Sequence, residues 1–145
     1  MIVLLFSAAT AYRAFISKNQ LSALVNQFTD ALEYARDTAI TAHTTVTLCA
    51  KGNNDHCGFH WQNGQLILNE KTQHVLRVLS AMPNQYQLLW RSTLGDSDAL
   101  RWRSDGFTRG QQGSFYICGK KLSAQIIVLR TGRLRVVTGE IVGCK

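Results

Sequence analysis

Residues 21–49 read LSALVNQFTDALEYARDTAITAHTTVTLC, and the hydrophobic pattern changes its period inside this stretch. From residue 21 onward, apolar residues recur at steps of three and four, which predicts an amphipathic helix. These positions are Leu21, Leu24, Val25, Phe28, Leu32, Ala35 and Ala39. After residue 44, apolar and polar residues alternate, which indicates strands. One helix followed by many strands predicts an α+β fold, with antiparallel β-sheet packed on a long N-terminal helix.

The helix is expected to extend back to residue 2, because no glycine or proline occurs before Gly52. Its first ten residues are mostly apolar, which is typical of a membrane or oligomer-core element. Ten helical residues rise only about 15 Å, half of a hydrocarbon core of about 30 Å. We therefore interpret 1–12 as the apolar membrane or filament-core part of a helix at 1–43. The remaining residues, 44–145, form a globular β-rich domain with a basic C-terminal hairpin.

The composition suits a single folded domain, since 46% of the 145 residues are hydrophobic and 17% are charged. Short alternating runs bounded by Gly, Asn, Asp or Ser mark the expected strands of this domain. These runs are 45–49, 59–61, 65–68, 75–79, 86–90, 100–103, 115–118, 125–130 and 134–137.

Four cysteines, Cys49, Cys57, Cys118 and Cys144, allow three disulfide pairings, and the sequence alone does not choose among them. Proximity along the chain favours Cys49 with Cys57 and Cys118 with Cys144, given an oxidising compartment. The first pairing closes a short polar loop, and the second ties the C-terminal end to the sheet.

No pattern of a catalytic or metal site stands out. Zinc is the alternative use of Cys49 and Cys57, because His56 and His60 lie close by, but the spacing matches no common structural zinc site. The chain has no G-x-S-x-G, P-loop, H-E-x-x-H or Rossmann glycine pattern. We therefore expect a protein that is not an enzyme and that has no metal and no other cofactor.

The net charge of +7 is concentrated at one end of the chain. Residues 1–100 carry seven basic and seven acidic side chains, whereas residues 101–145 carry nine basic and two acidic ones. The nine are Arg101, Arg103, Arg109, Lys120, Lys121, Arg130, Arg133, Arg135 and Lys145. This asymmetry indicates a polyanionic partner, either nucleic acid or an anionic membrane surface.

The stretch IIVLRTGRLRVV, residues 126–137, predicts a basic hairpin that turns at Thr131 and Gly132. A two-residue turn places Arg130 opposite Arg133, and Val128 opposite Arg135. The three arginines then share one face, and the core face holds Ile127, Leu129, Leu134 and Val136.

Like charges that face each other destabilise a sheet, and a phosphate partner explains their clustering. The alternative is a solvated strand face with charges that protect a sheet edge. Lys120, Lys121 and Lys145 extend the basic surface if the second disulfide brings their segments together. Arg101 and Arg103 form another basic segment around Trp102, which we expect in the core rather than stacked on a base. Binding would then be to the backbone and independent of sequence.

Several of these segments, in this order, resemble the GspH/FimT family of type IV minor pilins and type II secretion pseudopilins. Residues 31–49 resemble the family signature ALxxARxxAIxxxxxVxLC. The other matching features are Trp61, VLRV (75–78), SDGF (104–107), FYIC (115–118) and IVLRTGRLRV (127–136). The resemblance implies a type IV pilin-like fold and partnership with other minor and major pilins.

The chain is most similar to the FimT branch, which is known for DNA uptake in natural transformation. In that branch a C-terminal GRxR motif binds double-stranded DNA, and here the motif is Gly132, Arg133, Leu134 and Arg135. The resemblance also implies a Gram-negative inner membrane anchor, a periplasmic globular domain and a place in the extracellular pilus. The family's prepilin peptidase motif does not occur in this sequence, so membrane insertion and assembly are implied by the resemblance alone. The alternative within the family is a GspH-type pseudopilin that has a structural role and does not bind DNA.

Overall fold

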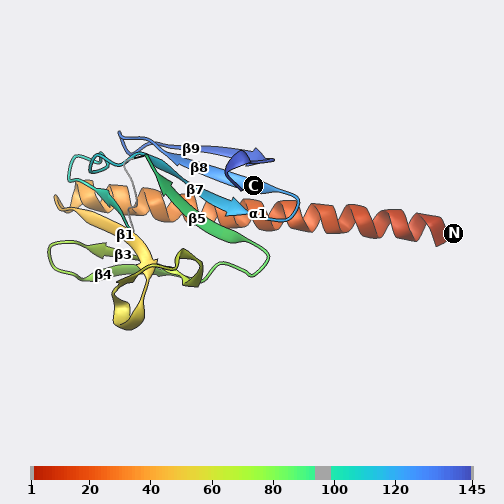
Figure 1. Ribbon diagram of the computed structural model, residues 1–145, viewed down its shortest axis with the longest axis horizontal. Helices are drawn as coiled ribbons and strands as arrows, with labels where there is room; N and C mark the ends of the chain where they lie inside the picture. Colours follow the sequence, from red (N-terminus) through yellow and green to blue (C-terminus); the bar gives the residue numbers. More distant parts are fainter. Residues whose placement is uncertain (1, 94–98, 145) are drawn as a thin grey trace.

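The computed structural model describes residues 2–93 and 99–144 (Figure 1). Its first element is the 40-residue helix α1 (Ile2–Thr41), close to the predicted span. The C-terminal half of α1 lies against two antiparallel sheets, and the N-terminal half projects beyond them (Figure 1). The predicted α+β architecture, with antiparallel sheets packed on a long N-terminal helix, is confirmed.

The amphipathic pattern of α1 matches its packing. The buried apolar residues of the helix are Leu21, Val25, Phe28, Ala31, Leu32, Ala35 and Ala39, with Leu24 partly buried beside them. Tyr12, Phe15 and Ile16, in the projecting half, are exposed instead. Within the part of the chain that the structure describes, no helix has a stretch long and apolar enough to cross a membrane.

The first sheet is built around β1 (Val46–Lys51). One side of β1 pairs with β3 (Gln65–Asn69), which pairs in turn with β4 (Val75–Leu79). Its other side pairs with β6 (Ala99–Trp102) and, at its end, with the two-residue strand β2 (Cys57–Gly58). Two 3-10 turns, η1 (Asn53–Asp55) and η2 (Trp61–Asn63), flank β2.

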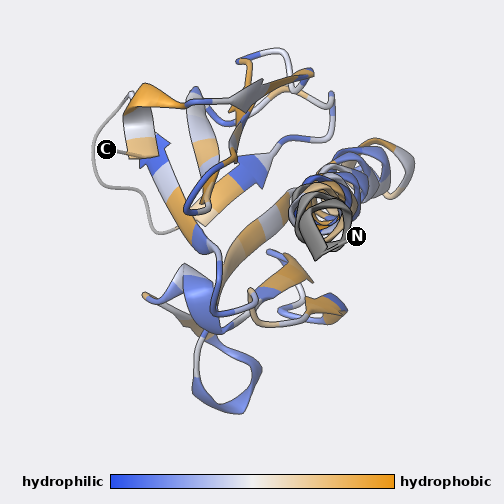
Figure 2. Ribbon diagram, turned by 90° about the vertical axis from the view of Figure 1, so that its right-hand side faces the viewer, coloured by the Kyte–Doolittle hydropathy of each residue, from blue (hydrophilic) through white to orange (hydrophobic). Residues whose placement is uncertain are grey.

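The second sheet has the order β5-β7-β8-β9 and is antiparallel throughout. Its strands are β5 (Gln87–Ser92), β7 (Gly113–Cys118), β8 (Ser123–Val128) and β9 (Leu134–Gly139), followed by the turn η3 (Val142–Cys144). Viewed along α1, the two sheets diverge from the helix as separate layers (Figure 2). All the sequence-predicted strands except 59–61 occur, with ends within two residues of those expected.

The predicted strand at 59–61 is wrong, because the chain turns there to bring Gln62 to the edge of the second sheet. Gln62 Oε1 accepts a hydrogen bond from Leu88 N at 2.9 Å, and Gln62 Nε2 donates to Tyr86 O at 2.7 Å. One amide side chain thus satisfies edge groups of the β5 region that have no neighbouring strand.

Phe115, on β7, is fully buried and connects the second sheet to the helix and to the η2 turn. Its ring centroid lies 4.8 Å from that of Phe28 on α1, 5.3 Å from Trp61 and 4.3 Å from Trp90 on β5. Trp102 is also fully buried, as predicted. This aromatic cluster is the centre of the core between the helix and the sheets.

Both predicted disulfides are present. Cys49 is joined to Cys57, and Cys118 to Cys144, each with a Cα–Cα distance of 5.6 Å. The two cysteines that a zinc site would need as thiolates are therefore bonded to each other.

Replacing Phe115 by Ala should lower the free energy of unfolding by about 3–5 kcal/mol, because the cavity left among three aromatic rings cannot fully collapse. Urea denaturation with the disulfides intact measures this change. Val136→Ala, at a 43% exposed position of the same sheet, is the control and should cost less than about 1 kcal/mol. Equal costs for the two variants would contradict the central role of Phe115.

Candidate nucleic-acid interface

The connection between β8 and β9 has five residues, 129–133, and is called the arginine loop below. Val128 pairs with Leu134 and Ile127 pairs with Arg135, so the predicted two-residue turn and its register are wrong by one residue. Arg130 does not face Arg133 across the hairpin. Within the loop, Leu129 N donates to Arg133 O at 2.9 Å and Gly132 N donates to Leu129 O at 2.8 Å.

The shift in register has a conformational reason. A tight two-residue hairpin turn of type I′ needs positive φ at both central residues, which a β-branched threonine does not readily adopt. In the arginine loop only Gly132 has positive φ, at 88°. The core face of β8 therefore consists of Ala124, Ile126 and Val128, which are fully buried. Ile127 and Leu129, predicted in the core, are only half-buried.

Arg36, on the last turns of α1, holds the arginine loop in place. Its Nε donates to Gly106 O at 3.2 Å, and its Nη2 donates to Thr131 O at 3.3 Å. Gly132 packs so closely against Gly106 O and the Arg36 side chain that a Cβ at this position would overlap them. In the sequence, Arg36 belongs to the helix signature, and no local pattern connects it with the loop.

The segment after β6 forms the other support of the loop. Thr108 N donates to Arg130 O at 3.0 Å, and the Thr108 hydroxyl donates to the same carbonyl at 3.1 Å. The loop backbone is thus tied both to the helix and to the turn at 103–108. Its arginine side chains are positioned by a fixed backbone.

The arginines on and around the arginine loop differ in whether they have acidic partners. Arg130, Arg133 and Arg135 are exposed, and none forms an ion pair with any residue in 2–93 or 99–144. The predicted contacts Arg101 and Arg103 do have acidic partners. Arg101 Nε lies 2.9 Å from Glu70 Oε1, Arg109 Nη1 lies 3.4 Å from Glu70 Oε2, and Arg103 Nη2 lies 3.0 Å from Asp105 Oδ2. Among the described residues, the three arginines on and beside the loop therefore have no carboxylate within ion-pair distance.

Lys120 and Lys121 lie in the turn between β7 and β8, at the opposite end of β8 from the arginine loop. Six residues of strand separate the two ends, a distance of about 20 Å. The Cys118–Cys144 disulfide brings the C-terminal end beside this lysine turn. Lys145 itself lies outside the described residues. The single basic surface expected from the sequence is therefore divided between two ends of the sheet.

Two carboxylates on α1 lie on the helix side of the arginine loop. Glu33 and Asp37 line a cavity of about 340 Å³ together with Arg36, Gly132 and Arg133. Their spacing of four residues predicts one helix face, but the sequence gives no signal that the loop packs beside that face. The helix side of Arg133 is consequently more acidic than its other side.

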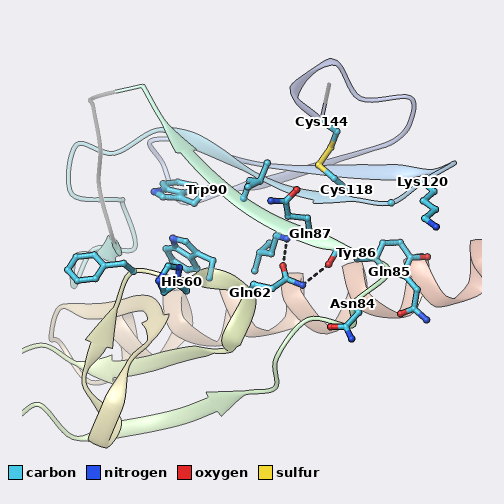
Figure 3. A pocket seen from close by; sticks show the side chains of 15 residues that line it. His60, Gln62, Asn84, Gln85, Tyr86, Gln87, Trp90, Cys118, Lys120 and Cys144 are labelled. Atoms are coloured by element: carbon cyan, nitrogen blue, oxygen red, sulfur yellow. Dashed lines mark hydrogen bonds between the residues drawn. A yellow bond between two sulfur atoms is a disulfide. The ribbon is translucent and has the colours of Figure 1, made fainter.

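A larger cavity, of about 730 Å³, lies between η2 and β5 (Figure 3). Trp90 lies on one side, His60 is close by, and Gln62 crosses toward Tyr86 with its two hydrogen bonds (Figure 3). Among the described lining residues, the charged side chain is Lys120, and there is no carboxylate to pair with His60 for acid–base chemistry. This cavity is separate from the arginine loop.

The model of the family described as type II transport protein GspH matches residues 24–132. The chain belongs to the GspH family. Its resemblance to the GspH/FimT group of minor pilins and pseudopilins is confirmed, and members of this group are structural pilins rather than enzymes. The match includes Arg36 and Gly106 and ends at Gly132, so Arg133 and Arg135 lie beyond it.

Two crystal structures of the type IV minor pilin FimU from Pseudomonas aeruginosa PAO1 have a similar fold. The first has a TM-score of 0.66 at 16% identity and covers 85% of this chain and 92% of FimU. The second crystal form has a TM-score of 0.60 at 17% identity, with coverages of 81% and 92%. No curated protein sequence matches the chain significantly.

Gly132→Ala tests the close packing between the arginine loop and Arg36. Because it adds overlap with Gly106 O to the strain of positive φ, we expect it to lower the free energy of unfolding by about 1–3 kcal/mol more than Gly139→Ala. Gly139 also has positive φ, at 127°, but no atom lies within 4 Å of the position that its Cβ would occupy, so it controls for strain alone. Chemical denaturation gives both values, and equal losses would mean that the close approach is unimportant.

Proposed function

We propose that this GspH-family chain is a minor type IV pilin that binds double-stranded DNA through its arginine loop, for DNA capture and uptake in natural transformation. The observation that carries the proposal is the group formed by Arg130, Arg133 and Arg135, exposed and without acidic partners in the described chain. They belong to the C-terminal third, which accounts for the whole net charge of +7. Such an excess favours a polyanion.

The chemistry of the loop suits phosphate. Guanidinium groups bind phosphate oxygens bidentately, and Arg133 and Arg135 are spaced about 6.8 Å apart along the chain. No helix among the described elements presents side chains as a recognition helix would, so contacts to the backbone, independent of sequence, are the expected mode. Because they have acidic partners, Arg101 and Arg103 contribute less. Lys120 and Lys121 form a second, separate contact, to which the sequence adds Lys145.

In this proposal the projecting half of α1 serves assembly. Tyr12, Phe15 and Ile16 are exposed aromatic and aliphatic side chains that need a partner surface. Other minor and major pilins, and before assembly the inner membrane of a Gram-negative cell, provide one. The globular domain then lies in the periplasm and later in the extracellular pilus.

A structural pseudopilin of type II secretion is the second candidate, favoured by the description of the matching family as a type II transport protein. Its partners are other pseudopilins, and it has no need of phosphate contacts. DNA binding by the arginine loop separates the two candidates.

The double variant Arg133→Gln/Arg135→Gln should make the slope of log affinity against log salt shallower by about two units, because two phosphate contacts are lost. Fluorescence anisotropy of residues 1–145 with short duplexes of unrelated sequence, at several salt concentrations, measures the slope. Wild-type affinity should be similar for every sequence.

The matched control is Lys51→Gln/Arg77→Gln, which removes the same charge from exposed positions of the first sheet. It should leave the slope within about half a unit of wild type. Equal effects of the two double variants, with folding intact, would refute the role of the arginine loop. Binding to anionic vesicles that DNA fails to displace would assign the loop to lipid headgroups instead.

A further inference from the structure

One face of the second sheet points away from α1 and is called the outer sheet face below. Four residues form a row across it, since Arg91 pairs with Ser114, Ser114 with Ile127, and Ile127 with Arg135. Side chains directly opposite in antiparallel strands project to the same face. Their chain neighbours Phe115, Ile126 and Val128 are buried on the other face. Arg91 and Arg135 are therefore the two ends of one row.

Arg91 is far from Arg135 in the sequence but shares its electrostatic character. Its side chain is exposed and forms no ion pair with the described residues. Its guanidinium carbon lies 5.5 Å from the ring centroid of Tyr116, which supports the side chain on the outer sheet face. Three strand spacings separate the backbones of the two arginines, a distance of about 14 Å.

Among the described residues, the C-terminal segment covers the outer sheet face at Tyr116. Gly143 packs so closely on the Tyr116 ring that a Cβ would overlap it, and the Cys118–Cys144 disulfide fixes this segment there. The row from Arg91 to Arg135 lies on the arginine-loop side of Tyr116. It is the part of the face that a ligand bound at the loop reaches first.

The opposite side of the loop is less suited to phosphate, because Glu33 and Asp37 line it and balance the charges of Arg36 and Arg133. A polyanion is attracted less to that side than to the outer sheet face, where Arg91 and Arg135 have no carboxylate within ion-pair distance among the described residues. The helix side of the arginine loop and the side toward the outer sheet face thus differ in charge. This difference favours the approach of a polyanion from the outer sheet face.

We infer that the duplex lies across the outer sheet face and that Arg91 is a further phosphate contact, on the opposite side of a DNA groove from Arg135. The separation of about 14 Å between their backbones is comparable with the major-groove width of about 12 Å. This inference rests on the proposed function and adds to it an orientation and a residue from the charge-neutral part of the sequence.

The first test compares Arg91→Gln with Arg77→Gln, in residues 1–145 with a short duplex. The two variants are matched, since each removes one exposed arginine that stacks on a tyrosine, Arg77 lying 4.0 Å from the Tyr34 ring centroid. Arg91→Gln should make the salt slope shallower by about one unit, so that the affinity lost between 50 and 200 mM salt becomes about 3.5-fold smaller. Arg77→Gln should leave the slope unchanged.

The second test introduces a carboxylate on one face or the other of the edge strand β9. Val137 is on the outer sheet face, paired with Gln125, and Val136 is on the other face, paired with Ile126. Both are similarly exposed, at 38% and 43%. Val137→Glu should raise the Kd for duplex DNA severalfold, because the new carboxylate repels the phosphates, and Val136→Glu should raise this Kd less.

The outcomes separate the inference from the proposed function. If Arg133→Gln/Arg135→Gln weakens binding while Arg91→Gln behaves like Arg77→Gln, the loop binds DNA but the duplex does not cross the outer sheet face. A larger effect of Val136→Glu than of Val137→Glu would also overturn the inferred orientation. A wild-type chain that does not bind DNA at low salt would overturn both. Circular dichroism of every variant verifies that the fold is retained.

Discussion

The geometry of the arginine loop depends on two hydrogen bonds donated by the Arg36 side chain. Turns that connect strands leave carbonyl groups without ladder partners, and a charged planar donor satisfies two of them at once. Here one guanidinium from α1 reaches Gly106 O and Thr131 O, in the connections before β7 and after β8. Gly132 fits beneath it because it has no side chain. Together with the hydrogen bonds from Thr108 to Arg130 O, these contacts of the helix fix the position of the loop.

Elements governed by local pattern could be predicted well. The buried stripe of α1 follows directly from its apolar spacing, and the cysteine pairing that proximity along the chain favoured is the one observed. The register of the last hairpin was predicted wrongly, because the two-residue turn would have required positive φ at Thr131. The contacts that hold the observed five-residue loop are not local, since Arg36 lies 95 positions before Thr131 and 70 before Gly106. A slip of one residue exchanges the two faces of a strand, so Ile127 and Val128 exchanged their expected environments.

In the candidate site, too, local features could be predicted from the sequence and contacts between distant residues could not. Charge counting located the basic third of the chain, but it could not show that Glu70 binds Arg101 and Arg109 from 31 and 39 residues away. Nor could it separate the lysine turn from the arginine loop, which requires knowing that they occupy opposite ends of β8. Arg91 had no sequence signal, because its neighbours in the row belong to three other strands.

The Cys118–Cys144 disulfide has a mechanical consequence. It closes a covalent ring, with a sequence separation of 26, that contains β8, the arginine loop and β9. A tensile force applied at the loop therefore divides between both arms of the hairpin and reaches β7 at Cys118 through a covalent bond. From there it passes into the centre of the sheet, because β7 is hydrogen-bonded on both sides and carries Phe115 in the core. The edge strand β9 cannot be peeled away from the domain by its C-terminal end, so the hairpin resists extension as a closed unit.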